Sequence, residues 1–360
     1  MNQRLESLLQ AMKRRALSDL LICDPFAIYY LIDATIEAGE RFSCLHLNSN
    51  GQMWLYQNRL FPIELPDELQ VEIVWYSDHE QPLTGLAASL STRVGVDKKF
   101  LARFLLPLIE AAPESHFELA SELVDLIRSR KDSAECEAMR LASHLNDTAM
   151  GRMYEVLGTG KTELEMVDVL RKAYRDLGCD QFSFEPIIAY GAHASDPHHQ
   201  NRDSKPVRGD SIVVDMGCIK DGYCSDMTRT FFYGEPSERG REVYETVLAA
   251  NLNAIATVRP GISHAEVDAA ARSVIEAAGY GPYFTHRLGH GIGLECHEGG
   301  DVSQGNTDLI EVGEIFSIEP GIYLPGELGV RIEDLVLVTE DGCELLNKYP
   351  KDLMIVEATD

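Results

Sequence analysis

The chain of 360 residues lacks the cysteine spacings that mark a zinc ribbon or a redox centre. Its eight cysteines are scattered and none forms a C-x-x-C pair, so we expect reduced and mostly buried thiols. The chain also lacks an apolar run of membrane-spanning length, and its amphipathic N-terminus has no signal-peptide apolar core. These absences predict a cytoplasmic protein.

Positive charge is also scarce. The chain has 32 lysines and arginines against 58 acidic residues, which gives a formal net charge of -26. Nucleic acids and anionic membranes repel such a surface, so we expect neither as a partner. The hydrophobic content of 45% is that of an ordinary globular protein, and a chain of this length predicts two domains.

The first 125 residues predict an α/β domain. Apolar residues at helical spacing over residues 1–16 are followed by short apolar runs broken by Asp-Pro, Asn-Gly and proline, which are typical of strands and turns. The runs that we interpret as strands are residues 19–24, 27–33, 44–56 and 71–76. A further strand leads into a helix over residues 101–109, and no catalytic constellation is present in this part.

A long helical pattern begins near Ser121 and continues to Leu157. Its polar segment, residues 128–133, is interpreted as the joint between the domains, with Ser133 near the start of a helix. The second domain is therefore expected over residues 126–360.

The second domain contains an internal repeat. A helical segment recurs at an offset of 101 residues and a strand recurs at an offset of 104, which indicates one duplicated helix-plus-strand unit. The alternative is chance similarity between two amphipathic helices. The matched pairs are Thr162 and Ser263, Glu165 and Glu266, Gly178 and Gly279, Gly209 and Gly313, Asp215 and Glu319, and Gly217 and Gly321.

The repeat places carboxylates in corresponding positions. Asp215 and Glu319 end matching strands, and after a hairpin in each copy come Asp226 and Glu333. Four carboxylates cannot share a dry cavity without cations, and carboxylate-dominated sites favour hard metals such as Mn²⁺ or Mg²⁺. Each carboxylate alone would be an ordinary surface or cap residue.

Histidines are concentrated in two segments. His286, His290 and His297 lie within twelve residues of a glycine-rich stretch, and spacing alone leaves a three-histidine zinc site open. The second segment, GAHASDPHHQ, contains His198 and follows a strand-like run. It is either a ligand-contacting loop or a solvated polar loop.

These residues resemble the pita-bread metallopeptidases, a family that includes prolidase, aminopeptidase P, methionine aminopeptidase and the metal-free creatinase. The strings DMGCIKDGYCSDMTRTF, HRLGHGIGLECHE, SIEPGIY and VRIED are similar to the prolidase and aminopeptidase P branch. The resemblance is strong from about residue 128 and weak before it. It implies an α/β (α+β) protein with a creatinase-like N-terminal domain and a pita-bread catalytic domain.

The resemblance implies a set of five metal ligands. By it, Asp215 holds one ion, His290 and Glu319 hold a second, and Asp226 and Glu333 bridge the two. We expect two divalent ions, manganese first, with cobalt or zinc as alternatives. A shared hydroxide would attack the scissile carbonyl, and Glu319 would accept its proton.

The resemblance also implies residues around the substrate. His198 and His297 would hydrogen-bond the substrate carbonyl or the tetrahedral intermediate, while His286 and Arg331 would support the pocket. An apolar slot for a proline ring has four candidate residues, whose alternative interpretation is the core of a strand: Phe182, Phe184, Ile188 and Tyr190.

The implied substrate is a small peptide with proline in second position, most simply an Xaa-Pro dipeptide. Several prolidases carry an arginine for the C-terminal carboxylate where this chain has Asp301. Either another cation, such as Arg41 of a partner subunit in a homodimer, replaces it, or the substrate is longer. The alternatives are an aminopeptidase P and a metal-free C–N hydrolase or binding module.

Overall fold

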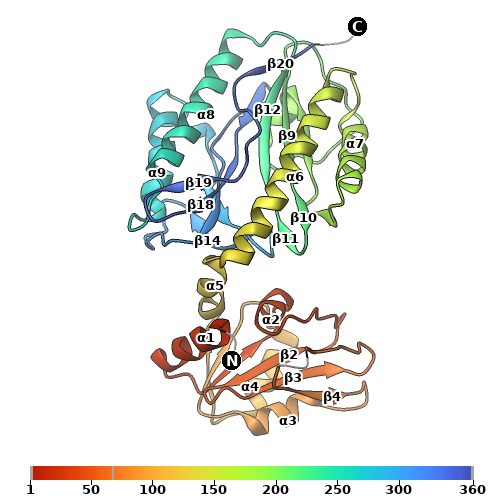
Figure 1. Ribbon diagram of the computed structural model, residues 1–360, viewed down its shortest axis with the longest axis vertical. Helices are drawn as coiled ribbons and strands as arrows, with labels where there is room; N and C mark the ends of the chain where they lie inside the picture. Colours follow the sequence, from red (N-terminus) through yellow and green to blue (C-terminus); the bar gives the residue numbers. More distant parts are fainter. Residues whose placement is uncertain (1–2, 67–68, 358–360) are drawn as a thin grey trace. The chain divides into compact units, whose positions relative to one another are not determined.

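The computed structural model describes residues 3–66 and 69–357. The chain divides into two compact units, Met1–Arg128 and Ser129–Asp360, coloured red to orange and yellow to blue in Figure 1. Among the described residues, no helix is long and apolar enough to cross a membrane.

The first unit is built on a six-stranded sheet with the order β4-β3-β2-β1-β5-β6. Antiparallel pairs join β1 to β2 and β2 to β3, while the outer pairs and β1–β5 are parallel. The strands are β1 (Asp19–Ile22), β2 (Cys44–Asn48), β3 (Met53–Asn58), β4 (Val71–Tyr76), β5 (Arg93–Val96) and β6 (His116–Leu119). Its helices are α1 (Gln3–Arg14), α2 (Pro25–Ile32), α3 (Pro82–Ser89) and α4 (Ala102–Ala111). The unit is thus α/β, as expected.

One predicted strand in this unit is wrong. Most of residues 27–33 forms helix α2, because Asp24 and Pro25 begin a helix rather than a turn. The Asp24 side chain accepts a hydrogen bond from the Phe26 amide at 3.0 Å, and proline is well suited to the first helical position. The apolar run is buried as a helix in the core.

Helix α5 (Glu122–Ser129) and helix α6 (Ser133–Leu157) account for the long helical pattern. Asp132 interrupts it. Its side chain accepts from the amides of Ala134 and Glu135, and the Glu135 side chain accepts from the Asp132 amide, a reciprocal capping box.

The second unit confirms the internal repeat. Helix α7 (Glu163–Asp176) and helix α9 (His264–Ala277) begin and end 101 residues apart, and each begins with a capping box, on Thr162 and on Ser263. Gly178 and Gly279 follow these helices with φ of 73° and 84°, where a side chain would be strained. The same chemistry therefore starts and stops both helices.

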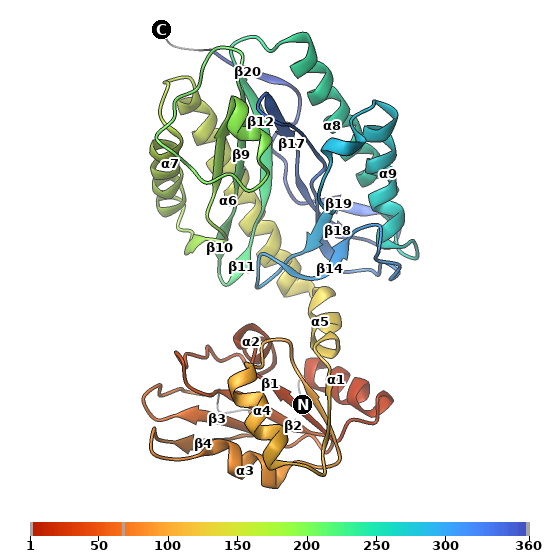
Figure 2. The ribbon, with the colours of Figure 1, turned by 180° about the vertical axis from the view of Figure 1, so that it is seen from behind.

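Each copy pairs its helices with a sheet, and the strand pairs are antiparallel except that one edge strand of the first sheet runs parallel to its neighbour. The first copy contains α6, α7 and a sheet of order β20-β12-β9-β8, and the second contains α8, α9 and a sheet of order β14-β13-β15-β18-β19. Figures 1 and 2 show α6 and α7 on one side and α8 and α9 on the other, with the strands between them. The elements are α8 (Glu238–Thr257), β8 (Ile187–Tyr190), β9 (Ser211–Met216), β12 (Met227–Tyr233), β13 (Gly289–Gly291), β14 (Glu298–Val302), β15 (Ile315–Ile318), β18 (Asp334–Val338), β19 (Cys343–Leu345) and β20 (Met354–Val356).

Short hairpins carry the chain away from each main sheet. One consists of β10 (Cys218–Lys220) and β11 (Tyr223–Cys224), and the other of β16 (Gly321–Leu324) and β17 (Leu328–Arg331). Strand β10 also pairs with β7 (Gln181–Phe182). Both hairpins were expected from the sequence.

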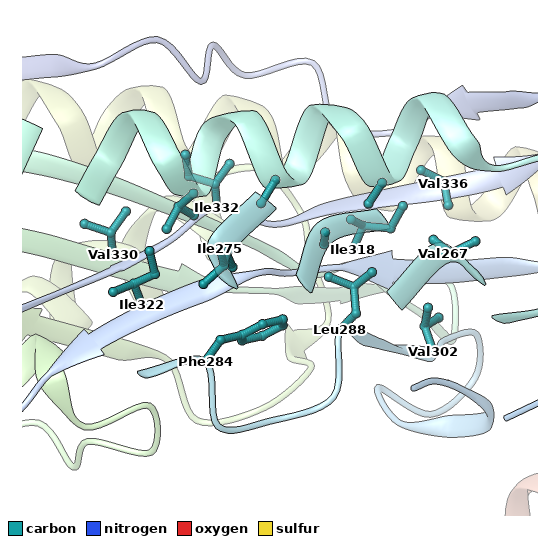
Figure 3. Packing of buried hydrophobic residues seen from close by; sticks show 14 of the residues in the cluster. Val267, Ile275, Phe284, Leu288, Val302, Ile318, Ile322, Val330, Ile332 and Val336 are labelled. Carbon is teal, nitrogen blue, oxygen red and sulfur yellow. The ribbon is translucent and has the colours of Figure 1, made fainter. Parts of the chain in front are cut away.

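Separate apolar cores support the two copies. In the second copy, branched aliphatic side chains of α8, α9 and the strands pack together, as Figure 3 shows for Val267, Ile318 and Val336. The first copy has its own cluster, which includes Met153, Leu170 and Val214. Because each helical layer packs on its own sheet, the polar ends of the strands are left to meet in a cavity.

Candidate metal centre and active site

The four predicted carboxylates line one cavity of about 350 Å³. Asp215 lies near the end of β9 and Asp226 directly precedes β12, which pairs with β9. Glu319 follows β15 and Glu333 directly precedes β18, which pairs with β15. The two copies therefore each supply one carboxylate from an outgoing strand and one from a returning strand.

His290 lies at the centre of β13, between two glycines that the packing requires. A Cβ atom on Gly289 would lie 1.9 Å from the Ser317 carbonyl oxygen, and one on Gly291 would lie 2.0 Å from the Gly299 carbonyl oxygen. The His290 amide donates to the Ser317 hydroxyl at 3.0 Å. These close contacts fix the backbone from which the imidazole projects.

The hydrogen bonding of His290 defines which nitrogen faces the cavity. Its Nδ1 lies 3.1 Å from the Gly291 carbonyl oxygen, which can only accept, so Nδ1 carries the proton. Nε2 then presents a lone pair 3.4 Å from Glu319 Oε1 and 3.7 Å from Asp226 Oδ2. A lone pair directed at two carboxylates is repelled by them unless a cation lies between.

Burial makes the charged state of this cluster costly without a cation. Burial raises the pKa of Asp226 and of Glu333 well above the usual range, and neighbouring carboxylates add to both shifts. Burial also raises the pKa of Glu319 to about 7, against the opposing charge of Arg331, and it lowers the pKa of His290 to about 3.

Two buried oxygen atoms also indicate that the cluster requires a cation. Within the described residues, Oδ1 of Asp215 and Oδ1 of Asp226 have no hydrogen-bond partner. An unpaired buried oxygen costs free energy, and a metal ion satisfies it as a ligand. Ligand atoms of Asp226, His290 and Glu333 already lie within 4.8 Å of one another. The donor set, mostly carboxylate oxygen with one imidazole, therefore fits hard divalent cations.

A hydrogen-bond network connects these candidate ligands. Arg331 donates to Asp215 Oδ2 at 2.6 Å, to the Thr228 hydroxyl at 3.1 Å and to the Tyr323 hydroxyl at 2.9 Å. The Thr228 hydroxyl in turn donates to Glu333 Oε2 at 2.8 Å. Arg331 thus orients one carboxylate directly and a second through Thr228.

His286 completes this network from the other side of Tyr323. Its Nδ1 lies 2.7 Å from the Arg287 carbonyl oxygen and must carry the proton, so Nε2 accepts from the Tyr323 hydroxyl at 2.9 Å. Burial and the charge of Arg331 lower the pKa of His286 to about 4, which keeps the ring neutral. Thr228 and Tyr323 were not predicted, because single polar residues in apolar strands have no spacing signal.

His198 and His297 both line the cavity with exposed side chains. The His297 ring lies edge-on to the His290 ring at 4.1 Å between centroids. Partial desolvation by the surrounding cavity walls, followed by the charge of Arg287, lowers the pKa of His297. The structure therefore brings both histidines beside the carboxylates.

A buried carboxylate holds the loop that carries His198. Glu163 lies 2.7 Å from His193 Nδ1 and 2.8 Å from His199 Nε2, and it accepts from the Arg202 amide at 2.7 Å. These three side chains also have the geometry of a metal-binding group. Because their hydrogen bonds already use both oxygens of Glu163, we interpret the group as a clamp on the loop.

The apolar lining differs in part from the expectation. Phe184 lines the cavity as predicted, together with Ile187 and Pro197. Tyr190 and Ile188 do not line it. They belong to the buried core of the first copy, because alternate side chains of β8 face opposite sides of the sheet. The Tyr190 hydroxyl donates to the Lys161 carbonyl oxygen.

Phe182, the fourth candidate for the slot, packs on Tyr174 rather than in the cavity lining. Arg41 belongs to the first unit, where Asp78 binds its guanidinium through two hydrogen bonds of 2.7 and 2.8 Å.

Two family models match the chain. The model of metallopeptidase family M24 matches residues 137–340, and the model of the Creatinase/Prolidase N-terminal domain matches residues 4–130. The first match contains all five candidate metal ligands. The structural relatives below also share the pita-bread fold expected from the sequence.

Individual proteins are similar over nearly the whole chain. An uncharacterized peptidase of Staphylococcus haemolyticus is 34% identical over 97% of this chain and 99% of its own length. A prolidase from Thermococcus sibiricus has a TM-score of 0.91 at 32% identity, with 99% of each chain covered. Dipeptidase PepE from Mycobacterium ulcerans has a TM-score of 0.93 at 35% identity, with 99% of this chain and 97% of that chain covered.

Proposed function

The chain belongs to metallopeptidase family M24, and from this premise we propose that it hydrolyses Xaa-Pro dipeptides at the bond before proline. The observation that carries the proposal is the cavity itself, in which four carboxylates and His290 face the apolar side chains of Phe184, Ile187 and Pro197. An apolar slot beside a hydrolytic centre suits a proline ring. The names of the similar prolidase and dipeptidase support a short substrate.

We propose that two divalent cations, manganese first and cobalt or zinc as alternatives, are held by the five predicted ligands: Asp215, Asp226, His290, Glu319 and Glu333. When bound, they would supply an activated water and polarise the scissile carbonyl. A three-histidine zinc site has less support, because Nε2 of His286 already accepts from Tyr323.

The side chains of this chain have separate roles in the proposal. Glu319 accepts the proton of the attacking water. The Ser317 hydroxyl donates to Glu319 Oε1 at 3.2 Å and so helps to orient this carboxylate. His198 and His297 donate hydrogen bonds to the oxygen that becomes negative as the carbonyl is attacked. Arg331 and His286 hold Asp215 and Tyr323 in place, so they orient ligands rather than react.

Proline explains why such a centre would be needed. A bond before proline has no amide hydrogen, so peptidases that require that hydrogen bond act poorly there. A centre that holds the carbonyl through cations and histidines does not depend on it.

The proposal is tested by comparing Ala-Pro with Ala-Pro-Ala, each with added Mn²⁺, Co²⁺ or Zn²⁺. We expect a higher kcat/KM for Ala-Pro. Faster cleavage of the tripeptide would instead support an aminopeptidase P, the second candidate, which the negative charge of Asp301 near the cavity favours. Full activity in metal-free protein would support the metal-free C–N hydrolase.

We also propose a cytoplasmic homodimer in which the domain over residues 1–125 forms the dimer contact and caps the partner's cavity. Light scattering after gel filtration tests the dimer, and a monomeric mass would contradict it. The substitution Arg41→Ala tests the cap, because a residue that reaches a partner's substrate would raise KM when it is removed.

A further inference from the structure

The cavity has two permanent positive charges among its described lining residues, Arg287 and Arg331. Arg331 is 4% exposed, and it is engaged by Asp215, Thr228 and Tyr323. Arg287 is different, because its side chain is 36% exposed and faces both the cavity and solvent. It is therefore the arginine that remains accessible to a ligand.

The pairing of two strands sets the position of Arg287. The amide of Leu288 donates to the Val302 carbonyl oxygen at 2.9 Å, at the start of the antiparallel pairing of β13 and β14. Next to this pairing, the Arg287 and Asp301 side chains form an ion pair between Nη1 and Oδ1. Asp301 therefore holds the guanidinium by one nitrogen.

The other donors of this guanidinium are available. Among the described residues, Nε and Nη2 of Arg287 have no hydrogen-bond partner. Two free N–H groups in a planar fork match the two oxygens of a carboxylate.

A substrate carboxylate needs such a group in this cavity. The two cations proposed above would balance the four carboxylates of the walls, which leaves Arg287 as the accessible cationic side chain of the described lining for an incoming anion. We propose that Arg287 binds the free C-terminal carboxylate of a dipeptide and so selects dipeptides over their neutral or longer analogues. The inference rests on the proposed peptidase function, and it assigns to Arg287 the role that Asp301 cannot perform.

The experiment measures kcat/KM of the metal-loaded protein for four substrates, Ala-Pro, Ala-prolinamide, Ala-Ala and Ala-alaninamide. The readout is the ratio of each free acid to its amide. Three variants are compared with the wild type: Arg287→Met, Arg287→Lys and Arg130→Met. Arg130 is the matched control, because it forms a similar half-exposed ion pair with Glu311 that is not part of the cavity lining.

We expect the wild type to prefer the acids, and Arg287→Met to lower the acid-to-amide ratio about 10- to 100-fold, as for the loss of a charge-assisted hydrogen bond. Arg287→Lys keeps the charge without the fork, so its ratio should fall less. Arg130→Met should keep the wild-type ratio. A merely structural role would lower acid and amide rates together and leave the ratio unchanged.

The substrate panel separates this inference from the proposed function. Equal wild-type rates for acids and amides, or an unchanged ratio in Arg287→Met, would overturn the role of Arg287 while leaving Xaa-Pro cleavage intact. A preference for Ala-Ala over Ala-Pro with the acid preference retained would overturn the proline specificity and support Arg287. A protein that cleaves none of the four substrates contradicts both.

Discussion

In the first copy of the repeat, α7 precedes β9 and β12, and in the second copy α9 precedes β15 and β18. The first copy supplies the shorter acids, Asp215 and Asp226, and the second supplies Glu319 and Glu333. Equivalent backbones thus carry carboxylates of different reach. Duplication explains why the carboxylates face one another, while later divergence gives each its own partners.

The first residues of α7 and α9 show this divergence most clearly. Glu163 and His264 are equivalent at the offset of 101, and both are buried. Glu163 holds His193 and His199 in the first copy, whereas His264 lies 3.4 Å from Glu314 in the second. The first residue of the helix is therefore a loop anchor in both copies. In the first copy it is an acid that holds histidines, and in the second it is a histidine that lies beside an acid.

The largest expected effect comes from removing the charge of either carboxylate that we propose to bridge the two cations. We predict that Asp226→Asn and Glu333→Gln each lower kcat/KM by about 1,000-fold or more, since several kcal/mol of transition-state stabilisation would be lost. Steady-state kinetics on Ala-Pro measures this, with metal analysis of each variant. Wild-type turnover in one variant alone would show that the two copies do not contribute equally.

The next effect concerns the two histidines that we place at the developing negative charge. His198→Ala and His297→Ala are each expected to lower kcat about 100-fold, as is typical when one stabilising donor is removed. Their metal content should stay that of the wild type. If either variant instead loses its metal, that histidine is a ligand and our assignment is wrong.

A smaller effect is expected from the loop anchor of the first copy. Glu163→Gln removes a charge that orders the loop of His198, so kcat should fall about 10-fold while metal content is retained. The free energy of unfolding should also fall by about 1–3 kcal/mol, because buried hydrogen bonds are lost. Unchanged kcat with reduced stability would mean that the anchor does not position His198.

The smallest effect is the pH dependence of the metal-free protein. Burial raises the folded-state pKa of Glu319 to about 7 and those of Asp226 and Glu333 well above the usual range. At pH values above the ordinary carboxyl pKa, the folded state then binds more protons than the unfolded state. The contribution of these groups to stability is therefore complete below the ordinary carboxyl pKa and is lost as the pH rises through the folded-state pKa values. The lowered pKa values of His286, His290 and His297 act in the opposite sense below about pH 6.5, so the measurement is made above it. Urea unfolding between pH 7 and pH 9 should show a decrease of about 1–3 kcal/mol. Bound metal should remove this decrease, and a rise in stability with pH would contradict the account.

The repeat made much of the second unit predictable, because capping residues and strand-end acids recur at fixed offsets. Residues recognised only through tertiary contacts were not predictable. Glu163 gave no signal because it looks like any acidic residue in a first helical turn, and Tyr323 and Thr228 look like strand residues. Side chains alternate between the two faces of β8, but this alternation does not tell which face the helices cover. The burial of Tyr190 could therefore not be predicted from the sequence.

The first unit shows a local limit of sequence reasoning. Asp24 and Pro25 were interpreted as a turn, although the same pair is an N-cap followed by a favoured first helical residue. Length did not resolve the choice, because helix α2 has only 8 residues.

Metal titration of the metal-free protein tests most directly whether the two copies act together on bound cations. Activity on Ala-Pro would be followed against bound metal measured by mass spectrometry. We expect activity to require metal, to reach its maximum at two ions per chain and to be lost on chelation. Full activity in protein shown to contain no metal would contradict this expectation.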